Sequence, residues 1–111
     1  MKKLILTLFV LASLPFLIFA HPPKKVKLNY TPGELVIEVI HPVKDAAQHY
    51  IDQITILIDG KEYKILKYSS QTTNESLIIE VKVPDLQKGS VIQVKANCNK
   101  MGLKSGKLKV K

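Results

Sequence analysis

The sequence predicts an all-β protein, an immunoglobulin-like antiparallel β-sandwich of about seven strands. Beyond residue 20, apolar and polar side chains alternate in short runs, and no run shows helical periodicity. Turn residues such as Asp59-Gly60 separate these runs at short intervals. The stretch from residue 21 to 111 is long enough for one small sandwich with a modest core.

The first 20 residues are predicted to be a secretory signal peptide, which leaves residues 21–111 as the domain. Two lysines after Met1 precede an almost wholly apolar run, and the small residue Ala20 suits cleavage. A retained membrane anchor is the alternative, but the run is shorter than the roughly 20 residues of a span and contains Pro15. No cysteine follows the run, which argues against a lipoprotein anchor. We therefore expect a periplasmic or extracellular protein that meets the membrane only through this peptide.

Four strands are expected in the first part of the domain, and the first three have apolar residues in alternation. Thr31-Pro32-Gly33 is a turn between the first and the second strand. A loop that contains two histidines separates the second strand from the third, and Asp59-Gly60 is a hairpin turn before the fourth. The expected strands are residues 25–30, 34–40, 50–58 and 61–68.

Three more strands are expected in the second part of the domain. A polar loop at 69–74 precedes the fifth strand, and Pro84 ends it. The Lys88-Gly89 turn precedes the sixth strand, and a loop at 97–102 follows it. The expected strands are residues 75–83, 90–97 and 107–111.

The charge is strongly positive and evenly spread. All 17 basic residues are lysines, against 9 acidic residues, and the formal net charge is +8. The lysines are spread along the chain with few aromatic residues among them, so the pattern does not favour a nucleic-acid partner, and neither does export. Most individual lysines are expected on solvated strand faces. Their summed field would nevertheless attract small anions.

The candidate metal ligands are the three histidines and the single cysteine of the chain. His21 opens the domain, His41 and His49 bound the loop after the second strand, and Cys98 follows the sixth. Imidazole and thiolate are good ligands for first-row transition metals. A lone cysteine forms no internal disulfide; metal ligation would protect its thiolate, and the alternative is a small buried apolar side chain. Together these residues predict one metal site, whereas no catalytic nucleophile or carboxylate pair is visible.

Two motifs carry a resemblance to a known family. His41-Pro42, followed by His49-Tyr50-Ile51-Asp52 and the Asp59-Gly60 hairpin, resembles the iron domain of desulfoferrodoxins and neelaredoxins, the superoxide reductases. The late motif of that family is Cys-Asn-x-His-Gly, and Cys98-Asn99-Lys100-Met101-Gly102 stands in its place. The resemblance covers nearly all of residues 21–111.

The resemblance implies a mononuclear non-haem iron that reduces superoxide to peroxide by one electron. In that case His21, His41 and His49 are equatorial ligands and Cys98 is the axial ligand. Met101 replaces the last equatorial histidine, and a thioether is a weaker, softer ligand. The family's Glu-Lys pair before the first histidine is absent, which leaves Lys44, the only lysine of the histidine loop, as the candidate guide for superoxide. Cleavage after Ala20 would make His21 the mature N-terminus, and its α-amino group would then be a further candidate ligand.

Two other interpretations stay open. Histidine, cysteine and methionine on an exported β-sandwich are the ligands of a blue-copper electron carrier, although usual cupredoxins place a histidine between the cysteine and the methionine. A metal-free interaction domain is the third interpretation; Met101 favours it, and the four other donors argue against it. The expected partners are superoxide or another small anion, an electron-donor protein of unknown identity, and further copies of the chain in a homo-oligomer.

Overall fold

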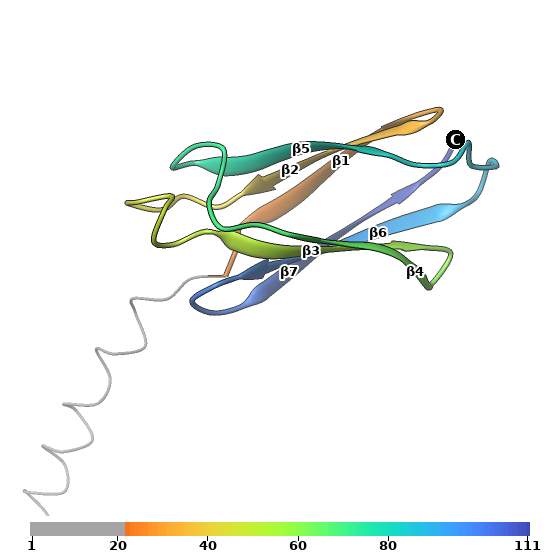
Figure 1. Ribbon diagram of the computed structural model, residues 1–111. Coiled ribbons are helices and arrows are strands. Elements are labelled where there is room, and N and C mark those ends of the chain that lie inside the picture. The colour runs from red at the N-terminus through yellow and green to blue at the C-terminus, as the bar shows by residue number, and fades with distance from the viewer. Residues whose placement is uncertain (1–21) are drawn as a thin grey trace, which may run out of the picture.

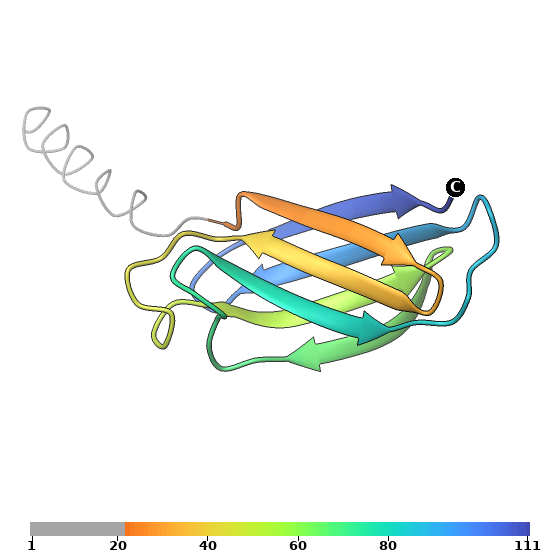
Figure 2. The ribbon, with the colours of Figure 1, turned by 90° about the horizontal axis from the view of Figure 1, so that it is seen from above.

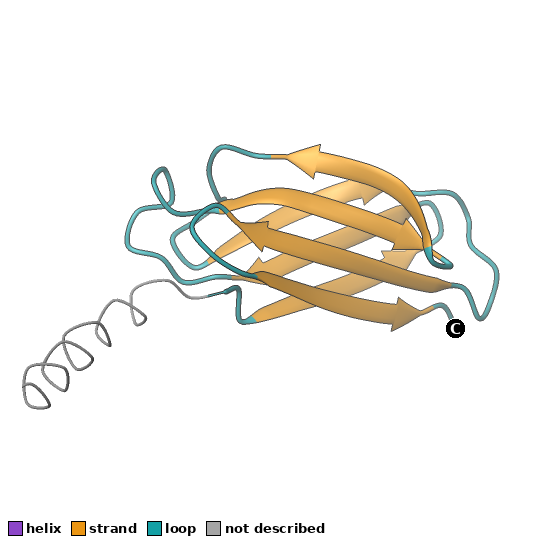
Figure 3. Ribbon diagram, turned by 90° about the horizontal axis from the view of Figure 1, so that it is seen from below, coloured by secondary structure: helices purple, strands orange, loops and turns teal. Residues whose placement is uncertain are grey.

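The computed structural model describes residues 22–111, which form seven strands and no helix (Figures 1 and 3). Both His21 and the signal peptide predicted for residues 1–20 lie outside the described residues. Across residues 22–111 there is no helix with the length and apolar character needed to cross a membrane. The strands are β1 (Lys25–Thr31), β2 (Glu34–Ile40), β3 (Ile51–Ile58), β4 (Lys61–Lys67), β5 (Ser76–Lys82), β6 (Val91–Cys98) and β7 (Leu103–Lys109).

The strands form two antiparallel sheets that pack face to face (Figure 2). One sheet has the order β1-β2-β5 and the other has the order β4-β3-β6-β7. Strands β2 and β5 pair directly, although β3 and β4 lie between them in sequence and belong to the other sheet. Such crossing between two sheets is typical of immunoglobulin-like sandwiches. The predicted fold class is therefore confirmed.

The core consists of the inward-facing side chains of both sheets. Alternate residues of β2 point inward, and Leu35, Ile37 and Val39 are fully buried. In the opposite sheet, Ile54 of β3 pairs with Ala96 of β6, and both are fully buried. The other fully buried residues of these two strands are Ile51, Ile56, Ile92 and Val94. Burial of an aliphatic side chain of this size contributes about 1.5–3 kcal/mol. This packing gives the loops at the sandwich ends a rigid support.

The seventh strand differs from its prediction. It was expected at residues 107–111, but it spans Leu103–Lys109 and pairs with β6 from Asn97 onward. Its first half lacks apolar alternation because Gly106 occupies an inward position, where a Cβ would lie 2.7 Å from the carbonyl oxygen of Val26 in β1. The glycine thus lets β1 approach β7. The preceding loop is correspondingly shorter than 97–102, and Cys98 ends β6 instead of lying in a loop.

Turn predictions agree with the structure. Asp59 and Gly60 have φ values of 51° and 83°, the left-handed pair that a two-residue type I′ hairpin needs. Gly33 and Gly89 also have positive φ values at their turns. The remaining strands begin and end within one residue of the expected positions.

Candidate metal centre

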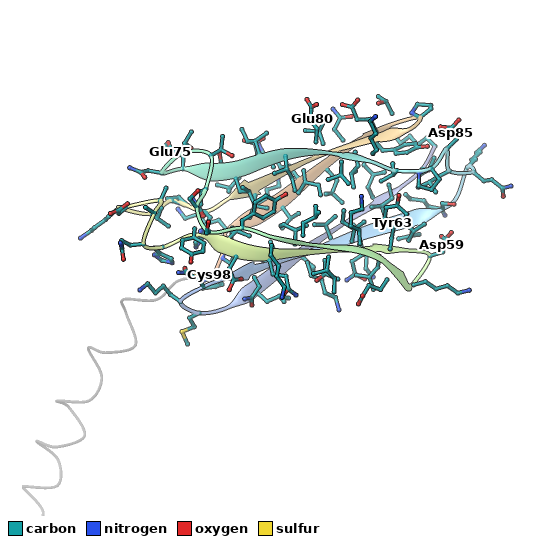
Figure 4. All side chains as sticks on the ribbon, in the orientation of Figure 1. Asp59, Tyr63, Glu75, Glu80, Asp85 and Cys98 are labelled. Atoms are coloured by element: carbon teal, nitrogen blue, oxygen red, sulfur yellow. The ribbon has the colours of Figure 1, made fainter. Side chains whose placement is uncertain are left out.

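Three of the predicted ligands meet at one end of the sandwich. His41 directly follows β2, His49 shortly precedes β3, and Cys98 is the last residue of β6. Figure 4 shows Cys98 at this end of the four-stranded sheet, with Asp59 at the opposite end. One ligand atom from each of the three residues lies within 4.8 Å of the others. Pairing of Ile51 with Cys98 across β3 and β6 brings the histidine loop to the cysteine.

The Cys98 thiol is enclosed and contacted by two groups. Its side chain is only 4% exposed, and Sγ lies 3.1 Å from His49 Nε2. The backbone N–H of Lys100 donates to Sγ at 3.4 Å. The backbone N–H of Cys98 itself donates to the Gly102 carbonyl oxygen at 3.0 Å. The turn after β6 therefore holds the sulfur in a defined position.

The histidine loop is ordered by two polar side chains. Asp45 forms a turn in which its carboxylate accepts the Ala47 N–H at 3.0 Å and its carbonyl oxygen accepts the His49 N–H at 2.9 Å. Asn99 clamps the far end of the loop: its Oδ1 accepts the Tyr50 N–H at 2.9 Å, and its Nδ2 donates to the Gln48 carbonyl oxygen at 3.1 Å. These contacts aim His49 toward the thiol.

His41 is buried, with one ring nitrogen bonded and the other not. Its side chain is 1% exposed, and Nδ1 is hydrogen-bonded to Oε1 of Gln71. Within residues 22–111, His41 Nε2 has no hydrogen-bond partner, although it is closed to solvent. An unsatisfied buried polar atom costs about 1–3 kcal/mol. The two histidine rings lie edge to face, with centroids 4.8 Å apart and an interplanar angle of 86°.

This arrangement fits a bound transition-metal ion. Two imidazoles and a thiolate are suitable donors, and atoms bound to one ion at about 2.1 and about 2.3 Å lie at separations like that of His49 and Cys98. A metal ion would also give the buried His41 Nε2 the partner that it lacks among the described residues. The cluster therefore supports a possible metal site.

The other predicted site residues are less directly placed. Met101 lies in the turn between β6 and β7 with its side chain 54% exposed, and Lys44 is exposed in the histidine loop. His21 lies outside the described residues, but its neighbour Pro22 lies against Gly102, where an added Cβ would come within 2.6 Å of the proline Cβ. The roles of His21, Met101 and Lys44 remain predictions.

A cleft adjoins the cluster, and the first described residues of the chain form part of its lining. It is lined by Pro22, Pro23, Lys24, His41, Pro42 and Lys104. Both of its lysines are exposed. The beginning of the described chain and His41 thus share one surface, and that surface is cationic.

Sequence reasoning missed the residues that support the ligands. Gln71 was part of a loop expected to be simply polar, yet it is only 7% exposed and bonded to His41. Asn99 belongs to the Cys98-Asn99 motif, but nothing in that motif indicates its contacts with the histidine loop. An amide in a polar loop carries no local pattern that distinguishes a buried partner from a solvated one.

Comparisons with known proteins give a structural match only. No protein-family model and no curated protein sequence matches the chain. Among solved structures, superoxide reductase (1Fe-SOR) from Giardia intestinalis matches with a TM-score of 0.63 and 17% identity, covering 81% of this chain and 100% of that one. Superoxide reductase (neelaredoxin) T24K from Ignicoccus hospitalis matches with a TM-score of 0.56 and 18% identity over 81% of both chains. Likenesses at these identities show that the folds are shared.

Proposed function

We propose that this protein is a relative of the superoxide reductases that binds one mononuclear non-haem iron and reduces superoxide by one electron to peroxide. The observation that carries the proposal is the cluster of His41, His49 and Cys98 with an unpartnered, buried His41 Nε2 among residues 22–111. The fold shared with superoxide reductase structures supports it. The apolar N-terminal run supports export to the periplasm or the extracellular space.

His21 is proposed as a further ligand. The residue that follows it, Pro22, lies against Gly102, and the carbonyl oxygen of Gly102 accepts the N–H of Cys98. The described chain therefore begins beside the turn that directly follows Cys98. Met101 belongs to the same turn and is proposed as a weak ligand, because a thioether is a softer and weaker donor to iron than imidazole is.

Each part of the centre has a defined task in this proposal. When bound, ferrous iron supplies one electron to superoxide, which with two protons from solvent becomes hydrogen peroxide; an electron-donor protein restores the ferrous state. Cys98 would hold the metal through its thiolate and supply electron density to it, and the Lys100 N–H, which donates to Sγ, would moderate that supply. Exposed lysines attract the anion: Lys44 in the histidine loop, and Lys24 and Lys104 at the cleft.

Copper is the second candidate metal. The described cluster contains two histidines and one cysteine, which is the trigonal ligand set of blue-copper sites, and methionine is their usual weak axial ligand. In that case the protein would carry electrons instead of reducing superoxide. A domain that binds no metal is the remaining alternative, and the buried, unpartnered nitrogen in the described part of the chain argues against it.

A loading experiment separates these functions. Protein spanning residues 21–111 is loaded anaerobically with ferrous iron and then oxidised, and the visible spectrum is recorded. We expect a thiolate-to-iron charge-transfer band that disappears in Cys98→Ser and persists in Ser105→Ala, an exposed control on β7. A copper centre would instead give an intense blue or green band with cupric ion and none with iron. Absence of any metal-dependent thiolate band would refute a metal centre at this cluster, and a loaded protein that does not consume superoxide would refute the reductase activity.

A further inference from the structure

We infer that Gln71 is a positioning residue for the metal centre: it holds His41 in the tautomer that presents Nε2 as the ligand atom. The inference deepens the proposed function and rests on it only for the identity of the metal ion that His41 would bind. Gln71 lies in the loop between β4 and β5, thirty positions from His41 in sequence. Its side chain is 7% exposed, so water does not compete freely for its amide.

Four hydrogen bonds determine the orientation of the Gln71 amide. One end of the amide faces the carbonyl oxygens of His41 and Thr73, at 3.0 and 3.1 Å. Because carbonyl oxygens only accept, this end is the NH2 group. The other end faces the backbone N–H of Ile51 at 3.1 Å, and an N–H only donates, so this end is the oxygen. The reversed orientation would place donor against donor and acceptor against acceptor.

The amide orientation in turn determines the tautomer of His41. The fourth bond joins Gln71 Oε1 to His41 Nδ1. Since the oxygen accepts only, Nδ1 carries the proton, and in the neutral ring Nε2 then has a free lone pair. That nitrogen is buried and has no partner within residues 22–111, so the lone pair is available for a metal ion. A neutral ring with an outward lone pair is the form in which histidine binds metals.

Gln71 also ties together the segments that build the site. Its side chain bonds to His41 after β2 and to Ile51 at the start of β3, and its backbone N–H donates to the Ala46 carbonyl oxygen at 3.3 Å. The backbone N–H of His41 donates to the Glu75 carbonyl oxygen at 2.9 Å, so backbone and ring are both held. The ligand is thus arranged before the metal binds, which lowers the ordering cost of binding.

The first test is made on the metal-free protein, so its outcome does not depend on the proposed function. Long-range proton–nitrogen NMR of labelled protein reports which ring nitrogen of His41 is protonated. We expect protonated Nδ1 in the wild type, and loss of this single tautomer in Gln71→Leu and in Gln71→Met, a side chain of similar length that offers no oxygen to the ring. Protonated Nε2 in the wild type would overturn the inference, and so would an unchanged tautomer in Gln71→Leu.

The second test measures ferrous iron affinity by competition with a chelator under anaerobic conditions. Loss of a group that orients a ligand typically weakens metal binding about 10–100-fold, and we expect this for Gln71→Leu. Gln71→Met should weaken binding as Gln71→Leu does, and Gln93→Leu, a half-buried control on β6, should bind as the wild type does. If Gln71→Leu does not fold, Gln71→Met and the wild-type tautomer decide the matter. Wild-type protein that binds no iron but shows protonated Nδ1 would refute the proposed function and leave the assignment of the tautomer standing.

Discussion

Replacement of Gly102 by alanine tests whether the contact with Pro22 helps to hold the metal centre. Gly102 has a φ of +94°, and an added Cβ would lie 2.6 Å from the Cβ and 2.9 Å from the Cα of Pro22. The left-handed conformation costs an L residue about 1–2 kcal/mol. Because carbon atoms pack at about 3.5–4.0 Å, Pro22 must also move by roughly 1 Å. Overpacking of this kind costs about 1–3 kcal/mol more.

Gly89 provides a matched control for the backbone term. Its φ is also +94°, but a Cβ at Gly89 would meet nothing within 4 Å. Gly89→Ala should therefore lose only about 1–2 kcal/mol of unfolding free energy, and Gly102→Ala should lose about 1–3 kcal/mol more. Urea denaturation of the metal-free proteins measures both losses. Equal losses in the two variants would refute the packing of Pro22 against Gly102.

The same pair of variants tests the proposed ligand His21. Displacement of Pro22 should move His21 away from the cluster, so Gly102→Ala should bind ferrous iron more weakly than Gly89→Ala does. In a His21→Ala background this difference should vanish, since the ligand that was displaced is already absent. A difference in iron affinity that persists in the His21→Ala background would contradict the role of His21.

Two further substitutions test the closure of the sandwich and the role of the turn after Cys98. Gly106→Ala should lower the unfolding free energy by about 1–3 kcal/mol, because the added Cβ would lie 2.7 Å from the Val26 carbonyl oxygen. Ser105→Ala, at the exposed neighbouring position, should change the unfolding free energy by less than about 0.5 kcal/mol. Urea denaturation measures both values. Met101→His should raise ferrous iron affinity in chelator competition by about tenfold, because imidazole is a better donor to iron than thioether is. An unchanged affinity would mean that position 101 does not face the metal.

Alternation of apolar residues was sufficient to predict five of the strands closely (β1, β2, β3, β5 and β6), because each of them has one face on the core. Strand β4 is almost wholly exposed, and its position followed instead from the Asp59-Gly60 hairpin turn. Alternation failed at the start of β7, where an inward position is occupied by Gly106 instead of an apolar side chain. The reason for that glycine is the nearby carbonyl oxygen of Val26, which belongs to the strand at the other end of the chain. No pattern within residues 103–109 contains that information.

The sequence by itself determined which side chains are able to bind a metal, since imidazole and thiolate groups are few in this chain and lie at strand ends. The tertiary structure decided which of them meet: pairing of β3 with β6 brings His49 to Cys98, and the packing of the two sheets places His41, at the end of β2, beside them. It also decided which ring nitrogen of His41 faces the cluster as an acceptor, because the inferred tautomer depends on the hydrogen bond to Gln71, an amide in a polar loop. The ability of a side chain to bind a metal is a chemical property of that single residue. Whether the ligands meet at one point, and which tautomer His41 adopts, depend on contacts between segments that are distant in the chain.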